Sequence, residues 1–475
     1  MPKLLKVFEI VLFGLIAFLF SFIPLYPKFP LENISGTFVA IRLEDLLIAL
    51  LLIIWMTYMF YSKRWKELLK DKLTIGFFIF FFIGFISLIS GIYLTHSVTV
   101  PHLGMFHYFR RIEFMLLLPV VFTVVKSRKQ VFGILGIISV TVLLVNIYAL
   151  GQRYLNWPVI STTNSEFAKG LILYLTPGAR VNSTFAGHYD LAVYLMMFLV
   201  AASGLFFTFK NFFIKGWLLF LSAFSFLVLI MTAARVSFFA ALIGIITTLL
   251  FARKNKFVIL IVILGIMIVA YPSGLRDRLV STITINVLEQ GQRYVPDNER
   301  QIVRNRLNIP TLSTPNSSDS AWTTLPQSTN SATTASDITP GEPLDSTDLA
   351  VYRSFGIRLN IEWPRALNAF YKNPLLGTGY SSIGLATDND ILRMLGEVGL
   401  LGTLAFVLIL IEIFKRIWVN LKSFDHLIRY FSAAGLALII AFVLNGVFID
   451  VFESSKVAAI FWMSMGLILS LEKIR

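Results

Sequence analysis

The sequence contains no cysteine, which excludes disulfide bonds and thiolate metal sites but leaves the compartment open. Histidine is scarce: its five copies are scattered and form no metal-binding motif, and no P-loop or other nucleotide-binding glycine motif follows a strand pattern. Charged residues make up only 14% of the chain, whereas hydrophobic residues make up 56% and the mean hydropathy is +0.76. We therefore predict an all-α polytopic membrane protein with neither a metal nor another cofactor.

Long apolar runs recur along most of the chain, and we expect about twelve transmembrane helices at roughly 20 residues per span. The expected spans are 4–23, 39–60, 73–94, 108–125, 131–151, 189–208, 213–231, 236–252, 257–272, 394–414, 430–449 and 456–471. The chain then divides into a first membrane region (1–272, spans one to nine), a long external loop (273–393, partly helical) and a second membrane region (394–475, spans ten to twelve). The first run lacks a signal-peptide cleavage site, so we expect it to be retained as a span.

The net charge of +14 comes from basic residues that lie in alternate gaps between the apolar runs and near both termini. Such an alternation is the orientation signal of a membrane protein. It predicts that both termini are cytoplasmic and that the loop 273–393 is external. The basic residues thus indicate the lipid bilayer as a partner, and nucleic acid is not expected.

Two segments in and just after the external loop differ in composition. Residues 308–348 are rich in Ser, Thr, Pro and Asn, and we predict a disordered insertion there because such a segment cannot bury a core. Residues 353–402 are mixed in character, and we interpret them as the catalytic face just outside the bilayer. In this stretch Pro364 favours a helix start, Pro374 ends that helix, and Asp388 or Asn389 can cap the next one.

Four arginines at the external edge are the first candidates for a functional site: Arg180, Arg235, Arg358 and Arg365. Arg235 is the clearest, because it lies between two apolar runs. A guanidinium group is costly there unless it meets a ligand, a carboxylate or water. The alternatives are a snorkelling or salt-bridged Arg235, and a self-neutralised row in which Glu362 lies between Arg358 and Arg365.

Carboxylates at the same edge are the candidates for proton transfer. Asp388 is either a base or a helix cap, and Glu397 either belongs to the site or pairs with Arg393 four residues before it. Asn389 and His188 are secondary candidates for the site, as are Arg365 and Glu397.

Four segments resemble elements of the O-antigen ligase / O-antigen polymerase superfamily, a group of polytopic bacterial glycosyltransferases. They are RLEDLLIA (42–49), ARVNSTFAGHYDLAVYLMM (179–197), TAARVSF (232–238), and IRLNIEWPRALNAFYKNPLLGTGYSSIG with the later DNDILRMLGEVGLLG (357–402). Their order, with a long loop before the last three spans, resembles that of the family. The family's His before Asn389 is replaced here by Asp388.

The resemblance implies an enzyme of the bacterial inner membrane that works on its outer face. Its donor would be a polyprenyl-pyrophosphate-linked glycan, such as an undecaprenyl pyrophosphate, and its acceptor a hydroxyl of a glycan or glycolipid. Arg180, Arg235 and Arg358 would bind the pyrophosphate without a metal, Arg235 would also act in catalysis, and Asp388 would be the base. The Asp388 replacement favours a polymerase or another glycan ligase over a lipopolysaccharide core ligase. We expect the three arginines to meet in one external cavity near Asp388.

Two other classes remain as alternatives at this point. A twelve-span transporter or flippase for a small solute or a lipid-linked sugar would show repeats and charges within its spans. Glu113, beside Arg110 and Arg111, is the clearest such charge. A non-catalytic membrane scaffold would not need several arginines on one side.

Overall fold

A computed structural model describes residues 2–27, 29–33, 40–159, 173–175, 179–283, 356–384 and 386–474. The insertion predicted at 308–348 and the start of the predicted catalytic face at 353–355 lie outside these residues. In the described part the protein is mostly helical, with two short antiparallel strand pairs.

The helices are α1 (Pro2–Leu25), α2 (Leu43–Ser62), α3 (Trp65–Leu68), α4 (Lys72–Tyr93), α5 (Pro101–Val124), α6 (Arg128–Tyr154), α7 (His188–Thr208), α8 (Phe212–Met231), α9 (Arg235–Phe251), α10 (Lys256–Ala270), α11 (Gly274–Ser281), α14 (Trp363–Lys372), α15 (Asp390–Asn420), α16 (His426–Gly446) and α17 (Ser455–Leu469). A π-helical turn (Arg358–Glu362) precedes α14, and a 3-10 turn (Ser470–Lys473) follows α17. The strand pairs are β1 (Pro30–Asn33) with β2 (Ala40–Arg42), and β3 (Pro158–Val159) with β4 (Leu173–Tyr174).

Each of the apolar runs found in the sequence falls mainly on one helix, but the count of about twelve spans is not confirmed. Among the described residues, nine helices are long and apolar enough to cross a membrane. The pair α10 and α11, bent by 84°, would make a tenth. The helix α9 is a shorter apolar helix of 17 residues, and α5 carries three charged side chains, Arg110, Arg111 and Glu113. The protein is therefore a multi-pass membrane protein whose number of spans stays a prediction.

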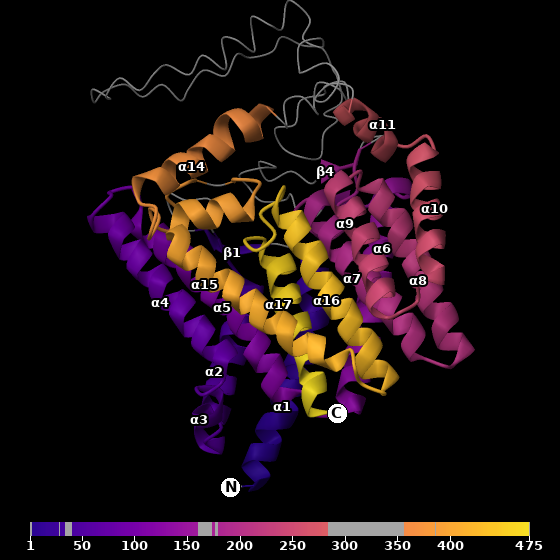
Figure 1. Cartoon of the computed structure of the whole chain (residues 1–475), viewed down its shortest axis with the longest axis horizontal. Helices are drawn as coiled ribbons and strands as arrows, with labels where there is room; N and C mark the ends of the chain where they lie inside the picture. Colours follow the sequence, from indigo (N-terminus) through magenta and orange to yellow (C-terminus); the bar gives the residue numbers. More distant parts are fainter. Residues whose placement is uncertain are drawn as a thin grey trace, which may run out of the picture.

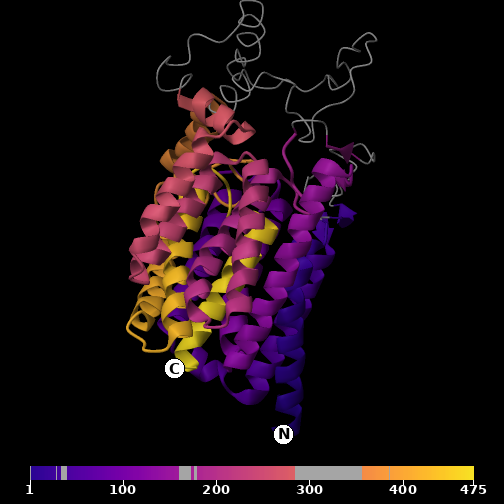
Figure 2. The ribbon, with the colours of Figure 1, turned by 90° about the vertical axis from the view of Figure 1, so that its right-hand side faces the viewer.

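The helices lie side by side, and both termini lie at one end of the bundle (Figure 1, Figure 2). The opposite end carries α11 and α14, in salmon and orange. The short helix α3 lies at the end with the termini. This arrangement separates the basic connection around α3 from the segment 356–384.

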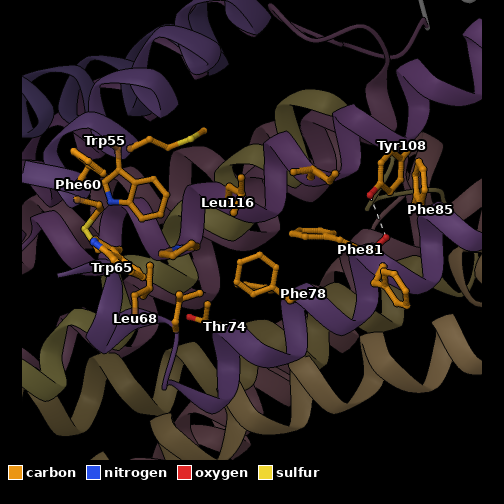
Figure 3. Close-up of a pocket in the computed structure, with 17 residues that line it drawn as sticks. Trp55, Phe60, Trp65, Leu68, Thr74, Phe78, Phe81, Phe85, Tyr108 and Leu116 are labelled. Carbon is orange, nitrogen blue, oxygen red and sulfur yellow. Dashed lines mark hydrogen bonds between the residues drawn. The ribbon is translucent and has the colours of Figure 1, made fainter. Parts of the chain in front are cut away.

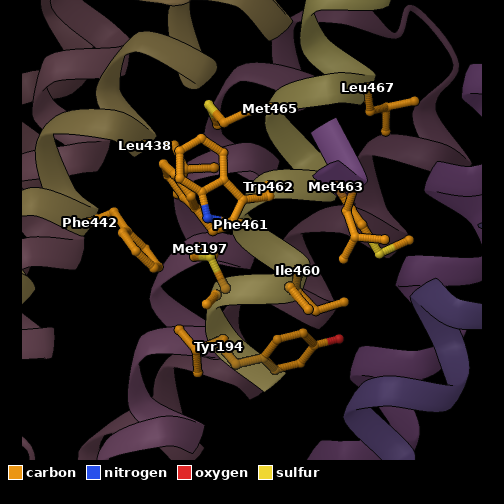
Figure 4. Close-up of a cluster of buried hydrophobic side chains, with 14 of the residues drawn as sticks. Tyr194, Met197, Leu438, Phe442, Ile460, Phe461, Trp462, Met463, Met465 and Leu467 are labelled. Atoms are coloured by element: carbon orange, nitrogen blue, oxygen red, sulfur yellow. The ribbon is translucent and has the colours of Figure 1, made fainter. Parts of the chain in front are cut away.

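The centre of the bundle is formed by α7, α16 and α17. Their apolar windows are 72%, 78% and 89% buried, compared with 28% for α8, as expected for helices that are apolar on all sides. Figure 4 shows the aromatic packing in this centre, where the rings of Phe442 and Phe461 stack with centroids 4.0 Å apart. Gly204 lets α7 approach α16, because a Cβ there would lie 2.4 Å from the carbonyl oxygen of Tyr430. The result is a tightly packed frame for the loops at the α11–α14 end.

Candidate functional site

Four arginines from four separate segments lie within electrostatic range of Tyr189, the second residue of α7. The group, which we call the arginine cluster, consists of Arg180, Arg235, Arg278 and Arg358. All four interact electrostatically with Tyr189. The cluster lies at the end of the bundle that carries α11 and α14 (Figure 1). The three arginines that the sequence singled out therefore lie together, while the external cavity expected around them stays a prediction.

Arg180 is positioned by a histidine at the start of α7. Its Nη1 donates a hydrogen bond to Nε2 of His188 over 2.6 Å. A guanidinium group has no acceptor atom, so Nε2 of His188 must carry the lone pair and the imidazole must be neutral. His188 is buried, and the positive charge of Arg278 also acts on its imidazole. His188, a secondary candidate of the sequence, thus orients Arg180 and adds no charge to the arginine cluster.

A tight turn between α8 and α9 positions Arg235. Thr232 donates from its hydroxyl to the carbonyl of Leu229 (2.6 Å) and accepts from the backbone N–H of Ala234 (3.3 Å). Ala233 between them has a left-handed φ of 52°, a conformation that is uncommon for a residue with a side chain. The turn places Arg235 at the first position of α9, where its Nη1 donates to the backbone carbonyl of Arg278 over 3.1 Å. Within the described residues Arg235 has no carboxylate partner.

Arg358 forms an ion pair with Asp388, 30 residues further along the chain. Its Nη2 and Nε donate to Oδ2 of Asp388 over 2.7 and 3.0 Å. Burial disfavours the charge on Arg358, but Asp388 and Tyr189 outweigh it and raise the arginine pKa above its usual value. For Asp388, burial raises the pKa, and the nearby Arg358 only partly offsets this rise. The carboxylate is therefore a stronger base than an exposed aspartate.

The backbone around Asp388 is fixed by its neighbours. Asn389, and not Asp388, is the N-cap of α15: its Oδ1 accepts from the backbone N–H groups of Ile391 and Leu392, each over 3.0 Å. Asp450 accepts from the backbone N–H of Asn389 over 3.1 Å. Asp388 itself has a left-handed φ of 49°, which Asp tolerates better than most residues. The helix-cap alternative for Asp388 is thus wrong, and its side chain is left to face Arg358.

Glu362 lies one turn after Arg358 and near Asp388. Burial, followed by the charge of Asp388, raises the pKa of Glu362 to about 7. Its Oε2 is buried and has no hydrogen-bond partner in the described part of the chain. Two carboxyl groups, of Asp388 and Glu362, therefore lie beside the arginine cluster, and both have raised pKa values.

Arg365 belongs to a different environment. Its Nη1 donates to the backbone carbonyl of Ile383 over 3.0 Å, and it is not among the arginines that interact with Tyr189. Pro364 lies in the first turn of α14, as expected, but the π turn before it makes the chain helical on both sides of Trp363. The self-neutralised row of Arg358, Glu362 and Arg365 is not formed, because Arg358 pairs with Asp388 instead.

Glu397 lies in a second polar group, which we call the buried ion network: Arg111, Arg393, Glu397, Asp450 and Glu453. Arg393 lies 3.6 Å from Glu397, 3.0 Å from Asp450 and 3.9 Å from Glu453. Arg111 forms an ion pair with Glu453. The alternative that Glu397 pairs with Arg393 is therefore confirmed. Glu397 also accepts from the backbone N–H of Ser381 over 3.1 Å, which ties the glycine-rich turn 377–384 to α15.

Sequence reasoning missed Arg278 and Tyr189. Arg278 lies on the short, polar helix α11, whose composition resembles that of any exposed loop helix. Tyr189 lies inside one of the segments that resemble the O-antigen superfamily, but an aromatic residue at the start of a span is also typical of a membrane interface. Only the fold, which brings α7, α9, α11 and the π turn together, distinguishes these two residues.

The comparison with known families agrees with this picture. A sequence model of a family described as O-antigen ligase matches residues 220–407. The matched segment contains Arg235, Arg278, Arg358 and Asp388, and it confirms the resemblance to the O-antigen ligase / O-antigen polymerase superfamily. The match supports a glycosyltransferase-like enzyme that acts in the synthesis of O-antigen or another surface polysaccharide, and it does not favour a transporter. A search of curated proteins found no match.

Proposed function

We propose that this protein transfers a glycan from a polyprenyl-pyrophosphate donor to a hydroxyl group of a glycan or glycolipid acceptor, as a polysaccharide polymerase or a ligase. The observation that carries the proposal is the gathering of four guanidinium groups around Tyr189. Planar guanidinium forks bind phosphate oxygens in pairs and stay charged at any physiological pH. A diphosphate, with its several negative charges, is the ligand that this arrangement suits best.

The charge balance of the cluster supports an anionic ligand. Asp388 neutralises Arg358, whereas Arg235 meets only a backbone carbonyl in the described residues. A half-buried guanidinium without a counter-ion is costly in a membrane protein. A bound diphosphate would supply the missing negative charge.

The proposed reaction is a displacement at the anomeric carbon of the donor. The acceptor oxygen forms a bond to this carbon while the bond from the carbon to the diphosphate oxygen breaks, and the diphosphate keeps the electron pair. The arginine cluster stabilises the charge that grows on the leaving diphosphate, which is the role that metal ions have in many diphosphate enzymes. The acceptor proton goes to a carboxylate, for which Asp388 is our candidate because one oxygen faces Arg358 and the other has no partner in the described residues.

The sidedness of the bundle supports an active site on the external face. Lys63, Lys66, Lys70 and Lys72 lie around α3, at the end that carries both termini. Loops rich in lysine stay on the cytoplasmic side. The arginine cluster lies at the other end, so the proposed topology places it outside the inner membrane, where a flipped lipid-linked glycan is available.

Alanine substitution at Arg235 tests the proposal. We expect Arg235→Ala to reduce glycan transfer about a hundredfold, or about 3 kcal/mol of transition-state stabilisation. Arg253→Ala is the matched control, because Arg253 follows the same helix α9 at its other end. The readout is the amount and chain length of surface glycan at equal protein level. Unchanged glycan with Arg235→Ala would refute the proposal, and an equal loss with Arg253→Ala would point to a general defect in folding. A change in chain length alone would indicate a polymerase.

A further inference from the structure

A long apolar groove lies on the lipid-facing side of the bundle, between α2, α4 and α5 (Figure 3). Its volume is about 680 Å³. Aromatic side chains line most of its length, with Trp55 and Trp65 at one end and Phe85 and Tyr108 at the other. The hydroxyl of Tyr108 donates to the carbonyl of Phe81 over 3.1 Å, so even this polar group is satisfied within the wall. The groove thus offers an almost wholly apolar surface.

The position of the groove along the helices identifies the leaflet that it faces. On α4 it runs from Thr74 to Phe85, and on α5 from Pro119 to Tyr108. At 1.5 Å per residue, each stretch is roughly 16 Å long, which is about half the hydrocarbon thickness of a bilayer. It begins two residues after the start of α4 at Lys72 but stops well before the end of α4 at Tyr93. The groove therefore faces the leaflet next to α3, on the side away from the arginine cluster.

The mouth of the groove carries an excess of positive charge. Trp65, Leu68 and Leu69 of the α3 connection line the groove itself. Four exposed lysines surround them and form no ion pair within the described residues: Lys63, Lys66, Lys70 and Lys72. Lys66 lies over the ring of Trp65, 5.7 Å from its centroid.

The nearby acids do not cancel this charge. Asp71 is already engaged, because its Oδ2 accepts from Arg416 over 2.8 Å. Glu67 is then the one acidic side chain of the connection 63–72 that remains to balance four lysines. Anionic headgroups are attracted by such a juxtamembrane basic group, and each basic residue contributes to the affinity.

We propose that this groove is a binding site for one anionic phospholipid of the leaflet next to α3, with an acyl chain along α4 and α5 and the phosphate at the lysines. An acyl chain of one leaflet matches the length of the groove, and the free lysines match a phosphate. The exclusion of a polyprenyl donor rests on the proposed function, which places its diphosphate at the opposite end of the bundle. The groove and its lysines do not depend on the proposed glycan transfer.

Native mass spectrometry of the full chain, released from vesicles of equal parts phosphatidylglycerol and phosphatidylcholine, tests the site. We expect one phosphatidylglycerol to be retained in preference to phosphatidylcholine. A variant with the four lysines around α3 changed to Gln should lower this preference on the order of fivefold or more. The matched control changes four lysines in other connections at the same end of the bundle. They carry the same charge that orients the protein in the membrane, but they do not lie at the groove: Lys129, Lys210, Lys215 and Lys256.

A second variant keeps the lysines and fills the groove. Ile112 lies on the groove wall of α5, between Tyr108 and Leu116. Ile112→Trp should release the retained lipid while the protein stays monodisperse, which keeps the test valid if the lysine variant does not fold. Equal retention of both phospholipids by the unchanged protein would overturn the proposal. An equal loss of preference in the lysine control would also overturn it, because only diffuse surface charge would then attract the lipid. Retention of a protein or a polyprenyl molecule in the groove would overturn it as well.

Discussion

The arginine cluster and the buried ion network both hold guanidinium groups in a membrane protein, but their charges are balanced in different ways. In the ion network, Arg111 and Arg393 lie among Glu397, Asp450 and Glu453, so positive charge is fully matched by carboxylates. In the arginine cluster, Asp388 pairs with Arg358, whereas Arg235 has no carboxylate partner among the described residues. We infer from this comparison that a guanidinium group at the end of a helix points to a ligand only when nearby acids do not already balance it.

The two groups also differ in what holds them. The ion network joins α5, α15 and the connection between α16 and α17, and Arg393 and Glu397 are almost fully buried. The arginine cluster depends on turns at the ends of helices, such as Thr232–Ala234 before α9. We infer that the network stabilises the fold, whereas the proposed function assigns the cluster to binding. Four predictions follow from this contrast, beside the Arg235 test.

The largest expected effect is on stability, and it concerns the buried ion network. Arg393→Ala leaves three carboxylates without their shared arginine, and we expect a loss of about 3–5 kcal/mol in the free energy of unfolding. Thermal unfolding of the detergent-solubilised protein measures this loss. Arg235→Ala should leave the unfolding temperature nearly unchanged. A protein as stable with Arg393→Ala as without it would remove the distinction between the two groups.

The next effect is on catalysis, and it concerns Asp388. We expect Asp388→Asn to lower the rate of glycan transfer about a hundredfold, because general-base catalysis is lost. A double variant separates this role from mere positioning of Arg358. If Asp388 acts as the base, Asp388→Asn should lower the rate further in an Arg358→Ala background. If the second substitution has no effect there, Asp388 only positions the arginine.

A smaller effect is expected at the centre of the arginine cluster. Tyr189→Phe keeps the ring but removes the hydroxyl, which interacts electrostatically with Arg358. The loss of one polar interaction of this kind is worth about 1 kcal/mol, or about fivefold. We expect it as a rise in KM for the lipid-linked donor with little change in kcat. A fall in kcat at constant KM would instead indicate that Tyr189 acts in the chemical step.

The smallest effect is the pH dependence of stability that Glu362 causes. Its pKa is raised from 4.5 to about 7 in the folded protein, so folding is favoured by its protonated form. This contribution is complete below the unfolded pKa and is lost as the pH rises through about 7. Glu362→Gln should therefore be more stable than the unchanged protein at pH 8, by up to about 1 kcal/mol after solvent screening, and nearly equal at pH 4. A stability difference between Glu362→Gln and the unchanged protein that is the same at pH 4 and pH 8 would contradict the raised pKa.

The sequence predicted the helices and three members of the arginine cluster, because both depend on local patterns. Apolar runs mark the helices, and an arginine such as Arg235 is conspicuous between two of them. Contacts between distant residues were not predictable in this way. Arg393 and Asp450 are 57 residues apart, and Arg278 lies on a helix with an ordinary polar composition.

Prediction from the sequence was also limited where two neighbouring residues have similar helix-capping propensities. Asp388 and Asn389 are both good N-cap residues, so the sequence left the cap of α15 open. The structure assigns it to Asn389, since the backbone of Asp388 is left-handed and Asp450 binds the N–H of Asn389. The choice depends on a contact from another part of the chain, which no local pattern contains.

Binding of a polyprenyl diphosphate to the purified protein tests the central claim most directly. Titration calorimetry in detergent compares the diphosphate with the corresponding monophosphate, for the unchanged protein and for Arg235→Ala and Arg253→Ala. We predict that the diphosphate binds at least tenfold more tightly than the monophosphate and that Arg235→Ala, but not Arg253→Ala, removes most of this difference. Equal affinity for the two lipids, or a diphosphate affinity that Arg235→Ala does not change, would contradict a diphosphate site formed by the arginine cluster.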